Sequence, residues 1–373
     1  MPHPPAPRVV VVVDAAGDRL PPDAATQVAT GWTARSPHVT VEPFVSHDGG
    51  AGLAAVVAQR LGGTTHPVVV PGPTGADVPA AITLVEDEAG GTAYLDSAQV
   101  CGRHLVDPDR LRDPEGMTSA GLGRLLTLAR GLGAARIVVG AGPLAPHDGG
   151  TGLLRELGAG DDLKDLAAVR AEWASTQLVL ATTTEASLLG FHGASASLGD
   201  LGVAPEVTQR LETTLGELTD RVNALLPPPR DLLTGLPRRP ERQAGSGAGG
   251  GVGYALQLLG ARTDTGARFL LDELGIRPRL PGALLVLVTD AYDYTTVHDG
   301  VVADTARAAL ETATPTVVLA REVAVGRREG MSLGVSGAYG LRPGESLGDL
   351  AGRVARTWTP APPSPPSPPG DVA

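Results

Sequence analysis

The sequence HDGGAGL at residues 47–53 occurs again, with one change, as HDGGTGL at residues 147–153. An apolar run rich in β-branched residues precedes each copy, and an Ala/Leu-rich helical pattern follows each. The sequence therefore predicts a strand, a loop and a helix at both places. Glycine lets backbone N–H groups approach a ligand, and a helix N-terminus attracts anions, so phosphate chemistry is the first function to test.

A structural interpretation of the same two loops stays open. An aspartate followed by two glycines before a helix is also an ordinary device that caps the helix and turns the chain. In that case Asp48 and Asp148 are N-caps, and the glycines after them form tight turns.

Short apolar segments alternate with helical patterns along the rest of the chain. Strands of the buried, parallel kind are predicted at 9–13, 39–44, 137–139, 178–181, 284–288 and 316–319. Helices are predicted at 24–34, 53–61, 121–132, 205–226, 252–259 and 301–311. This alternation indicates an α/β architecture.

The composition is that of a globular protein and limits the partners of the chain. A length of 373 residues suggests about two domains, and 42% of the residues are hydrophobic. A net charge of -11 and 3% aromatic residues argue against a nucleic-acid partner, because such binding needs clustered cations and stacking rings. Cys101 is the only cysteine, which excludes an intramolecular disulfide and a metal site made of several cysteines.

The sequence does not predict export or membrane insertion. Residues 9–13 are shorter than the apolar region of a signal peptide, and no apolar run approaches the roughly 18 residues that cross a bilayer. We therefore expect a cytoplasmic protein without a membrane partner. The proline-rich ends, residues 1–7 and 360–373, are expected to be disordered tails.

A glycine-rich run at 245–253 follows a proline-rich stretch at 226–243, which we expect to be a surface connection. Residues 245–250 fit the pattern G-x-G-x-x-G, but no predicted strand precedes them, as the dinucleotide-binding fingerprint requires. A tightly packed glycine turn and a phosphate-binding loop therefore both stay open.

Several longer stretches resemble the bacterial glycerate kinase family, of the kind that phosphorylates the 2-hydroxyl of D-glycerate. Residues 92–108 are similar to the family's Glu-x-Ala-x-x-x-Gly-Leu segment. Residues 118–128 and 135–157 resemble its Thr-x-Gly-x-Gly-Glu-Leu helix, the next strand and its Gly-Gly-Ser-x-Thr-Asn-Asp-Gly-Gly loop. Residues 193–195 and 245–256 resemble its Gly-Ala-Ser element and its Gly-Ala-Gly-x-x-Gly-Gly-Leu-Gly run. The resemblance covers almost the whole chain between the tails.

The resemblance implies two α/β domains, one inserted in the other, with a cleft between them. Residues 8–75 and 285–359 would form the discontinuous domain, and residues 76–284 the inserted one. It also implies ATP and Mg²⁺ as cofactors, and glycerate or a similar hydroxy acid as a small-molecule substrate. The sequence does not predict the oligomeric state.

The resemblance also suggests which residues form the site, and it implies that both glycine loops face the same cleft. The catalytic candidates are Asp48, Asp148 and Arg19. The candidates for binding substrate or phosphate are Asp14, Gly49, Gly50, Gly149, Gly150, Ser195, Gly247, Gly249 and Gly250. Asp48 and Asp148 are expected to act on the substrate or on the metal, and the residues that would hold the metal stay open.

The chain departs from the family pattern at several polar positions. Gly17, Thr183, Ala186 and Ala291 stand where the pattern has Lys, Asp, Asn and Glu, and His147 replaces the Asn before Asp148. Among the residues that could replace the lost groups are Arg19, Asp290, Asp293 and Asp299.

Two hypotheses therefore follow from the sequence. The first is an ATP-dependent glycerate kinase that forms 2-phosphoglycerate. The alternative is a catalytically impaired relative that acts as a small-anion-binding, regulatory or structural module, because fold does not imply function.

Overall fold

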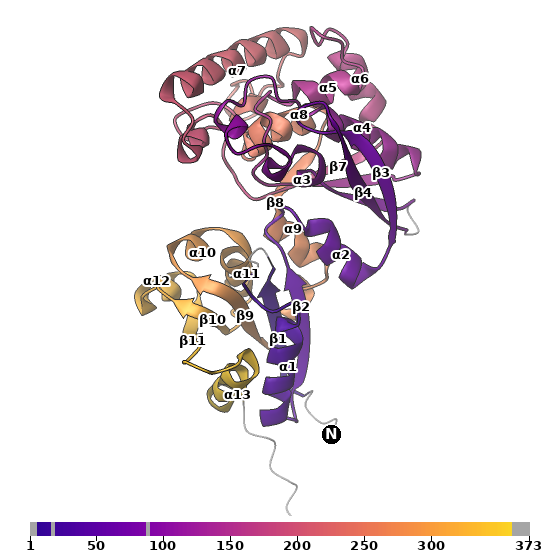
Figure 1. Ribbon diagram of the computed structural model, residues 1–373. Helices are drawn as coiled ribbons and strands as arrows, with labels where there is room; N and C mark the ends of the chain where they lie inside the picture. Colours follow the sequence, from indigo (N-terminus) through magenta and orange to yellow (C-terminus); the bar gives the residue numbers. More distant parts are fainter. Residues whose placement is uncertain (1–5, 16–18, 87–89, 360–373) are drawn as a thin grey trace, which may run out of the picture. The chain divides into compact units, whose positions relative to one another are not determined.

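A computed structural model describes residues 6–15, 19–86 and 90–359 of the chain. The chain divides into two compact units (Figure 1). The first unit is formed by residues 1–46 and 275–373, and the second by residues 47–274. Each unit is built around one β-sheet with helices packed on it, so the predicted α/β class is confirmed.

The first unit contains a five-stranded sheet of order β11-β10-β9-β1-β2, in which all neighbouring strands are parallel. Its strands are β1 (Arg8–Asp14), β2 (Thr40–Ser46), β9 (Ala283–Tyr292), β10 (Thr316–Val323) and β11 (Val335–Gly340). Its helices are α1 (Ala24–Arg35), α10 (Tyr294–His298), α11 (Gly300–Glu311), α12 (Arg327–Ser332) and α13 (Leu347–Trp358).

The core of the first unit forms around its central strands. The valines of β1 are buried because α1 and α13 cover one face of the sheet. These two helices lie side by side (Figure 1). They can approach closely because Gly31 has no side chain: a Cβ at this position would lie only 2.1 Å from the Gly348 carbonyl oxygen.

The second unit contains a six-stranded sheet of order β3-β4-β5-β6-β7-β8. Its strands are β3 (Thr64–Pro71), β4 (Asp77–Val85), β5 (Thr92–Asp96), β6 (Arg136–Ala141), β7 (Gln177–Thr182) and β8 (Arg262–Thr265). Its helices are α2 (Leu53–Leu61), α3 (Ala98–Cys101), α4 (Ala120–Gly131), α5 (Thr151–Glu156), α6 (Leu166–Trp173), α7 (Pro205–Leu225), α8 (Val252–Leu258) and α9 (Gly266–Glu273). Strands β5 to β8 are parallel, whereas β3 and β4 pair antiparallel.

The division between the units differs from the expected one. We expected the chain to pass from one domain to the other near residue 75, but the passage lies between Ser46 and His47. The physical reason is that β3 and β4 form a hairpin whose second strand pairs with β5, which places both in the second sheet. The second passage lies at Gly275, not at residue 285.

The expected tails lie mostly outside the described residues, as does Gly17. At the amino-terminal end, the Pro7 carbonyl oxygen accepts a hydrogen bond of 3.0 Å from the Thr40 backbone N–H. Pro7 is therefore tied to β2 and does not belong to a disordered tail.

The four parallel strands of the second sheet end along the same edge. Their last residues are Asp96, Ala141, Thr182 and Thr265. Loops at the carboxyl edge of a parallel sheet are the usual place for a ligand in α/β proteins.

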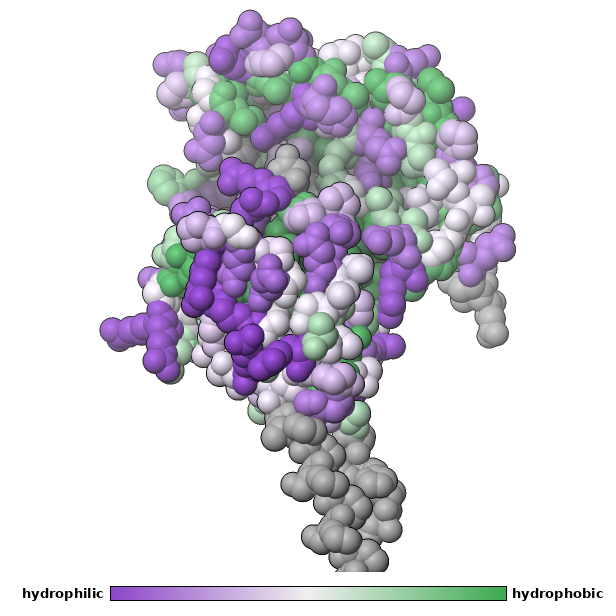
Figure 2. Space-filling view, turned by 60° about the horizontal axis from the view of Figure 1, so that its bottom comes forward, coloured by the Kyte–Doolittle hydropathy of each residue, from purple (hydrophilic) through white to green (hydrophobic). Residues whose placement is uncertain are grey.

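The outside of the protein is largely polar on the face shown in Figure 2, where hydrophobic residues are interspersed among hydrophilic ones. Among the described residues, every helix is too short or too polar to cross a bilayer.

Candidate functional site

The first glycine loop lies on the carboxyl edge of the second sheet. A Cβ on Gly49 would lie 2.9 Å from the Gly266 Cα and 3.0 Å from the Ala181 carbonyl oxygen, and a Cβ on Gly140 would lie 2.9 Å from the Gly49 oxygen. The backbone of Gly49 also has a φ of 102°, which disfavours other residues. Glycine is needed here because the loop contacts the ends of β6, β7 and β8 through backbone atoms.

Asp96, and not Asp48, accepts hydrogen bonds from the backbone N–H groups at the start of the helix after this loop. The Asp96 carboxylate accepts hydrogen bonds from the backbone N–H groups of Gly52 (3.2 Å) and Ala54 (3.1 Å). Burial raises the pKa of Asp96, and these two bonds offset only part of that rise. The interpretation of Asp48 as the N-cap of α2 is therefore wrong, since Gly52 occupies that position and Asp96 comes from β5.

Asp48 instead binds within its own loop. Its Oδ1 atom accepts a hydrogen bond of 2.9 Å from the Gly50 N–H and lies 3.0 Å from Nδ1 of His47. Burial raises the pKa of Asp48, but the bonds from His47 and Gly50 outweigh this effect, so the pKa lies below its ordinary value. Asp48 is therefore ionised at neutral pH.

Asp148 joins the N-terminal ends of two helices. Its Oδ2 atom accepts bonds from the Ser119 N–H (3.0 Å), the Ser119 hydroxyl (2.9 Å) and the Gly152 N–H (3.0 Å), and its Oδ1 atom accepts one from the Gly150 N–H (2.9 Å). Ser119 precedes α4, and Gly150 precedes α5. These four bonds describe a side chain that holds the second glycine loop in place.

His147 is buried against Ser195, with 3.0 Å between its Nε2 atom and the Ser195 hydroxyl. Burial lowers the pKa of His147 to about 4, so the ring is neutral at physiological pH. This bond connects the loop after β6 to the residues before the 3₁₀-helix η3 (Ala196–Leu201).

The pKa of His147 predicts a loss of stability in mild acid. Because the folded pKa of about 4 lies below the unfolded value near 6.5, the unfolded chain gains a proton that the folded chain excludes as the pH falls between these values. We expect this group to cost on the order of 3 kcal/mol by pH 4. Chemical unfolding between pH 7 and 4.5 should show a smaller loss in His147→Gln than in the parent protein. The exposed His104→Gln control should follow the parent, and identical curves for all three proteins would contradict the prediction.

The glycine-rich run forms a tight turn before α8. Gly249, Gly250 and Gly251 have φ values of 57°, 64° and 105°. A Cβ on Gly250 would lie 2.2 Å from the Pro146 oxygen, and a Cβ on Gly247 would lie 2.3 Å from the Ser187 oxygen. Since a 3₁₀-helix at Pro240–Arg242 precedes this run, the context of the dinucleotide fingerprint is not met. Close backbone packing therefore requires glycine at these positions, and their role in binding phosphate stays a prediction.

A cavity of about 470 Å³ lies among these loops in the second unit. It is lined by residues 142–144, 146–147, 183–184, 186, 192–194, 196–198, 200–201, 247 and 249–250 together with Arg103. Backbone atoms of glycines form part of the wall, so polar N–H and C=O groups line it alongside side chains. Thr183 and Ala186, two departures from the family pattern, both line this cavity.

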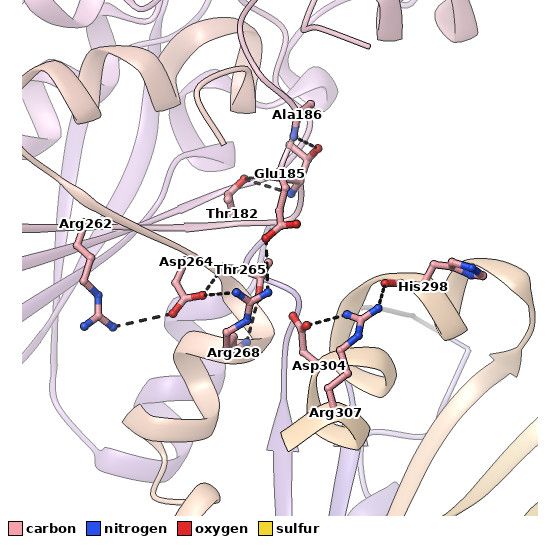
Figure 3. A network of polar contacts seen from close by, with 11 residues as sticks. Thr182, Glu185, Ala186, Arg262, Asp264, Thr265, Arg268, His298, Asp304 and Arg307 are labelled. Carbon is pink, nitrogen blue, oxygen red and sulfur yellow. Dashed lines mark hydrogen bonds and ion pairs between the residues drawn. The ribbon is translucent and has the colours of Figure 1, made fainter. Parts of the chain in front are cut away.

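The wall that carries Thr183 and Ala186 is held by local hydrogen bonds (Figure 3). The Thr184 N–H donates to the Thr182 hydroxyl (3.2 Å), and the Ala186 N–H donates to the Thr184 hydroxyl (3.1 Å). Glu185 pairs at 3.5 Å with Arg268, which also pairs at 3.5 Å with Asp264. These contacts fix the segment at the end of β7.

The structure brings some of the predicted site residues together and not others. Gly247, Gly249 and Gly250 line the cavity, whereas Ser195 is not among its lining residues and contacts one of them, His147. Gly49 and Gly50 lie beside it at the sheet edge, whereas Asp48, Asp148, Gly149 and Gly150 are not among its lining residues.

Two predicted site residues, Asp14 and Arg19, belong to the first unit. Asp14 ends β1, and Arg19 pairs at 3.5 Å with Asp290 while its side chain is 74% exposed. Asp290 also pairs at 3.1 Å with Arg321, at the carboxyl edge of the first sheet. Their roles in a site stay predictions.

The other residues considered as replacements have local roles. Asp293 accepts a hydrogen bond of 3.0 Å from the Thr296 N–H and caps α10, and Asp299 precedes α11. Ala291, which stands where the family pattern has Glu, lies within β9.

Two charged residues that line the cavity, Arg103 and Asp200, were not predicted from the sequence. Arg103 lies inside the stretch 92–108, but the sequence alone does not show that this stretch meets the loop after β6. Among the described residues, no cluster of three or more His, Cys, Asp or Glu side chains could hold a metal ion.

Comparison with known proteins identifies relatives of nearly the full chain. The profile described as "Glycerate kinase family" matches residues 9–351. An uncharacterized protein of Mycobacterium bovis is 33% identical, over 94% of this chain and 86% of its own. The glycerate kinase of Bacillus subtilis is 26% identical over 86% of both chains. A crystal structure from Salmonella typhimurium LT2, assigned as glycerate kinase 2, aligns with a TM-score of 0.74 at 25% identity and covers 95% of this chain and 98% of its own. The chain belongs to the glycerate kinase family.

Proposed function

We propose that this protein is a kinase that transfers the terminal phosphoryl group of ATP to the hydroxyl of D-glycerate and releases 2-phosphoglycerate. The observation that carries the proposal is the cavity at the carboxyl edge of the second sheet, which is lined by glycine loops that resemble those of the family. Phosphoryl transfer depends mainly on positioning and on electrostatic stabilisation of phosphate charge. Backbone groups of the lining glycines, together with polar side chains such as Thr183 and Thr184, suit that task.

The residues at the cavity fit a phosphate-bearing ligand with a bound Mg²⁺. Mg²⁺ usually keeps several waters and phosphate oxygens as ligands and needs only one or two protein carboxylates. Asp200 is the one residue with a carboxylate among the described residues that line the cavity. Thr183 and Thr184, which also line it, have hydroxyl groups that can form hydrogen bonds with a polar substrate. When bound, Mg²⁺ would neutralise charge that develops on the phosphate oxygens.

The two aspartates of the glycine loops have different proposed roles. A Cβ on Gly50 would lie 3.2 Å from Asp48 Oδ1 and 3.4 Å from the methyl group of Thr183, a residue that lines the cavity, so only Gly50 separates the ionised Asp48 from that residue. We assign to Asp48 the orientation of the substrate hydroxyl and acceptance of its proton. Asp148 positions the second loop through its four hydrogen bonds.

Turnover with defined substrates tests the proposal. The purified protein is incubated with MgATP and D-glycerate, with L-glycerate as a parallel substrate, and the products are identified by mass spectrometry and ³¹P NMR. We expect ADP and 2-phosphoglycerate in equal amounts from D-glycerate. ATP hydrolysis without phosphoglycerate, or no reaction at all, would contradict the kinase assignment.

A second function is favoured by one observation, namely that two departures from the family pattern, Thr183 and Ala186, line the same cavity. A site that lost an acid and an amide there could bind a small anion without transferring phosphate. Binding of D-glycerate or ADP without any turnover would support this impaired module.

Thr183→Asp should distinguish a weakened kinase from a pure binding protein. The new carboxylate would restore, in the cavity wall, the acid that the family pattern has at this position, and a positioned acid or base contributes factors of about 100 to 10000 in rate. We expect kcat for D-glycerate to rise at least about tenfold. Thr213→Asp adds the same charge at an exposed position of α7 and should leave kcat unchanged. A folded Thr183→Asp variant with unchanged kcat would contradict the prediction.

A further inference from the structure

Arg103 is held at the wall of the cavity by the loop that follows β6. Its Nε–H donates a hydrogen bond of 3.2 Å to the Leu144 carbonyl oxygen. The Ala145 N–H donates to the Cys101 carbonyl oxygen at 2.8 Å, and Gly102 and Leu144 form an isolated β-bridge, so the backbone on both sides is fixed. The guanidinium therefore has a defined position between two elements that line the site.

The positive charge of Arg103 has no compensating anion among the described residues. The Leu144 carbonyl is its one polar partner there, and no carboxylate forms an ion pair with it. Burial lowers the pKa of the Arg103 guanidinium, which is half-buried. An arginine has five N–H donors, and a partly desolvated cation with few partners is costly to the free protein.

Besides Arg103, the ionisable side chains that line the cavity are those of His147, His192 and Asp200. His147 is neutral at physiological pH because burial lowers its pKa to about 4. His192 is exposed, and Asp200 carries the opposite sign without forming an ion pair with Arg103. Arg103 is thus the one arginine or lysine among the described residues that line the cavity.

The residue type fits an oxyanion better than a neutral ligand. A guanidinium presents paired N–H groups whose spacing matches the two oxygens of a carboxylate or phosphate. The family segment quoted above, Glu-x-Ala-x-x-x-Gly-Leu, has leucine after its glycine, whereas this chain has Arg103 after Gly102. The charge is therefore a feature of this chain and not of that pattern.

We propose that Arg103 is an anion-binding residue of the cavity and contacts an oxyanion group of the ligand through its terminal amino groups. This inference rests on the proposed function for the location of the ligand. The oxyanion is either the carboxylate of the hydroxy acid or a phosphate of the nucleotide, and the test separates the two.

Calorimetric binding to D-glycerate, to ADP and to inorganic phosphate, each alone, tests this role without any need for turnover. We expect Arg103→Gln to weaken at least one of these ligands tenfold or more, and Arg103→Lys to weaken it less. Loss for D-glycerate alone assigns the carboxylate, and loss for ADP or phosphate assigns the phosphate. Arg124→Gln removes the same charge from an exposed position of α4 and should change each affinity less than twofold.

Thermal unfolding of the free variants separates binding from a structural role. If Arg103 is an uncompensated cation, Arg103→Gln should keep the melting temperature of the free protein or raise it, while the gain in melting temperature on adding the ligand falls. The proposal is overturned if Arg103→Gln binds all three ligands like the parent protein. It is also overturned if the parent binds none of them. Turnover of D-glycerate with unchanged binding in Arg103→Gln would overturn it while leaving the kinase assignment intact.

Discussion

Gly250→Ala should destabilise the second unit by about 2–4 kcal/mol and abolish ligand binding at the cavity. The new Cβ would lie 2.2 Å from the Pro146 carbonyl oxygen and 2.8 Å from the His147 Cα, and both neighbours are backbone atoms that cannot rotate away. The backbone φ of 64° adds strain for any residue with a side chain. Because these contacts join the glycine-rich turn to the loop after β6, relief of the overlap has to displace one wall of the cavity.

The matched control is Gly216→Ala. A Cβ on Gly216, inside α7, would meet nothing within 4 Å, so this change should stabilise the helix by up to about 1 kcal/mol. Denaturant unfolding and calorimetric binding of D-glycerate measure both effects. A Gly250→Ala protein with parental stability and affinity would show that this turn neither packs tightly nor shapes the cavity.

Asp148→Asn should cost about 1–3 kcal/mol of stability and at least tenfold in kcat. The carboxylate accepts four hydrogen bonds, and an asparagine offers an oxygen at one of its two positions only. The amide NH₂ group would then face the N–H of Gly150 or the donors on Ser119 and Gly152, which leaves donors opposed to donors. The loop that carries His147 should loosen as a result, and kcat should fall because the loop is misplaced.

Asp220→Asn is the matched control, since Asp220 is an exposed residue on α7. It should keep the stability and kcat of the parent protein. The loss of stability and the loss of kcat in Asp148→Asn should be compared. If Asp148 only positions the loop, its replacement should also weaken the contacts of Ser119 and His147, and stability and kcat should fall together. An Asp148→Asn variant with full stability but no activity would instead assign Asp148 to the reaction itself.

The long, strongly patterned elements of this chain could be predicted from the sequence. The run of valines at β1 is typical of a strand that is buried on both faces of a sheet. The spacing of apolar residues in α2 is typical of a helix that is buried along one side. The hairpin β3–β4 was missed because its strands are partly exposed, and the pattern of β3 does not differ enough from that of a loop. Because this hairpin belongs to the second sheet, the boundary lies between Ser46 and His47 and not near residue 75, where the family resemblance implied it.

The site was harder to predict because its residues are far apart in the sequence and meet only through the order in which the strands pair. Asp96 caps α2 from a distance of more than forty positions, and Arg103 reaches the loop at Leu144. Neither contact leaves a local pattern, since each depends on β5 pairing with β6. The glycines could be located, but whether they serve a ligand or only packing could not be read from their spacing.

Hydrogen–deuterium exchange with and without ligand tests most directly the claim that this cavity is the substrate site. The protein is saturated with D-glycerate and a non-hydrolysable ATP analogue, and exchange is followed by peptide. We predict slower exchange in peptides that cover 183–187 and 245–253, with no change in the proline-rich stretch 226–243 as an internal control. Unchanged exchange in both cavity peptides at saturating ligand would contradict the claim that this cavity is the substrate site.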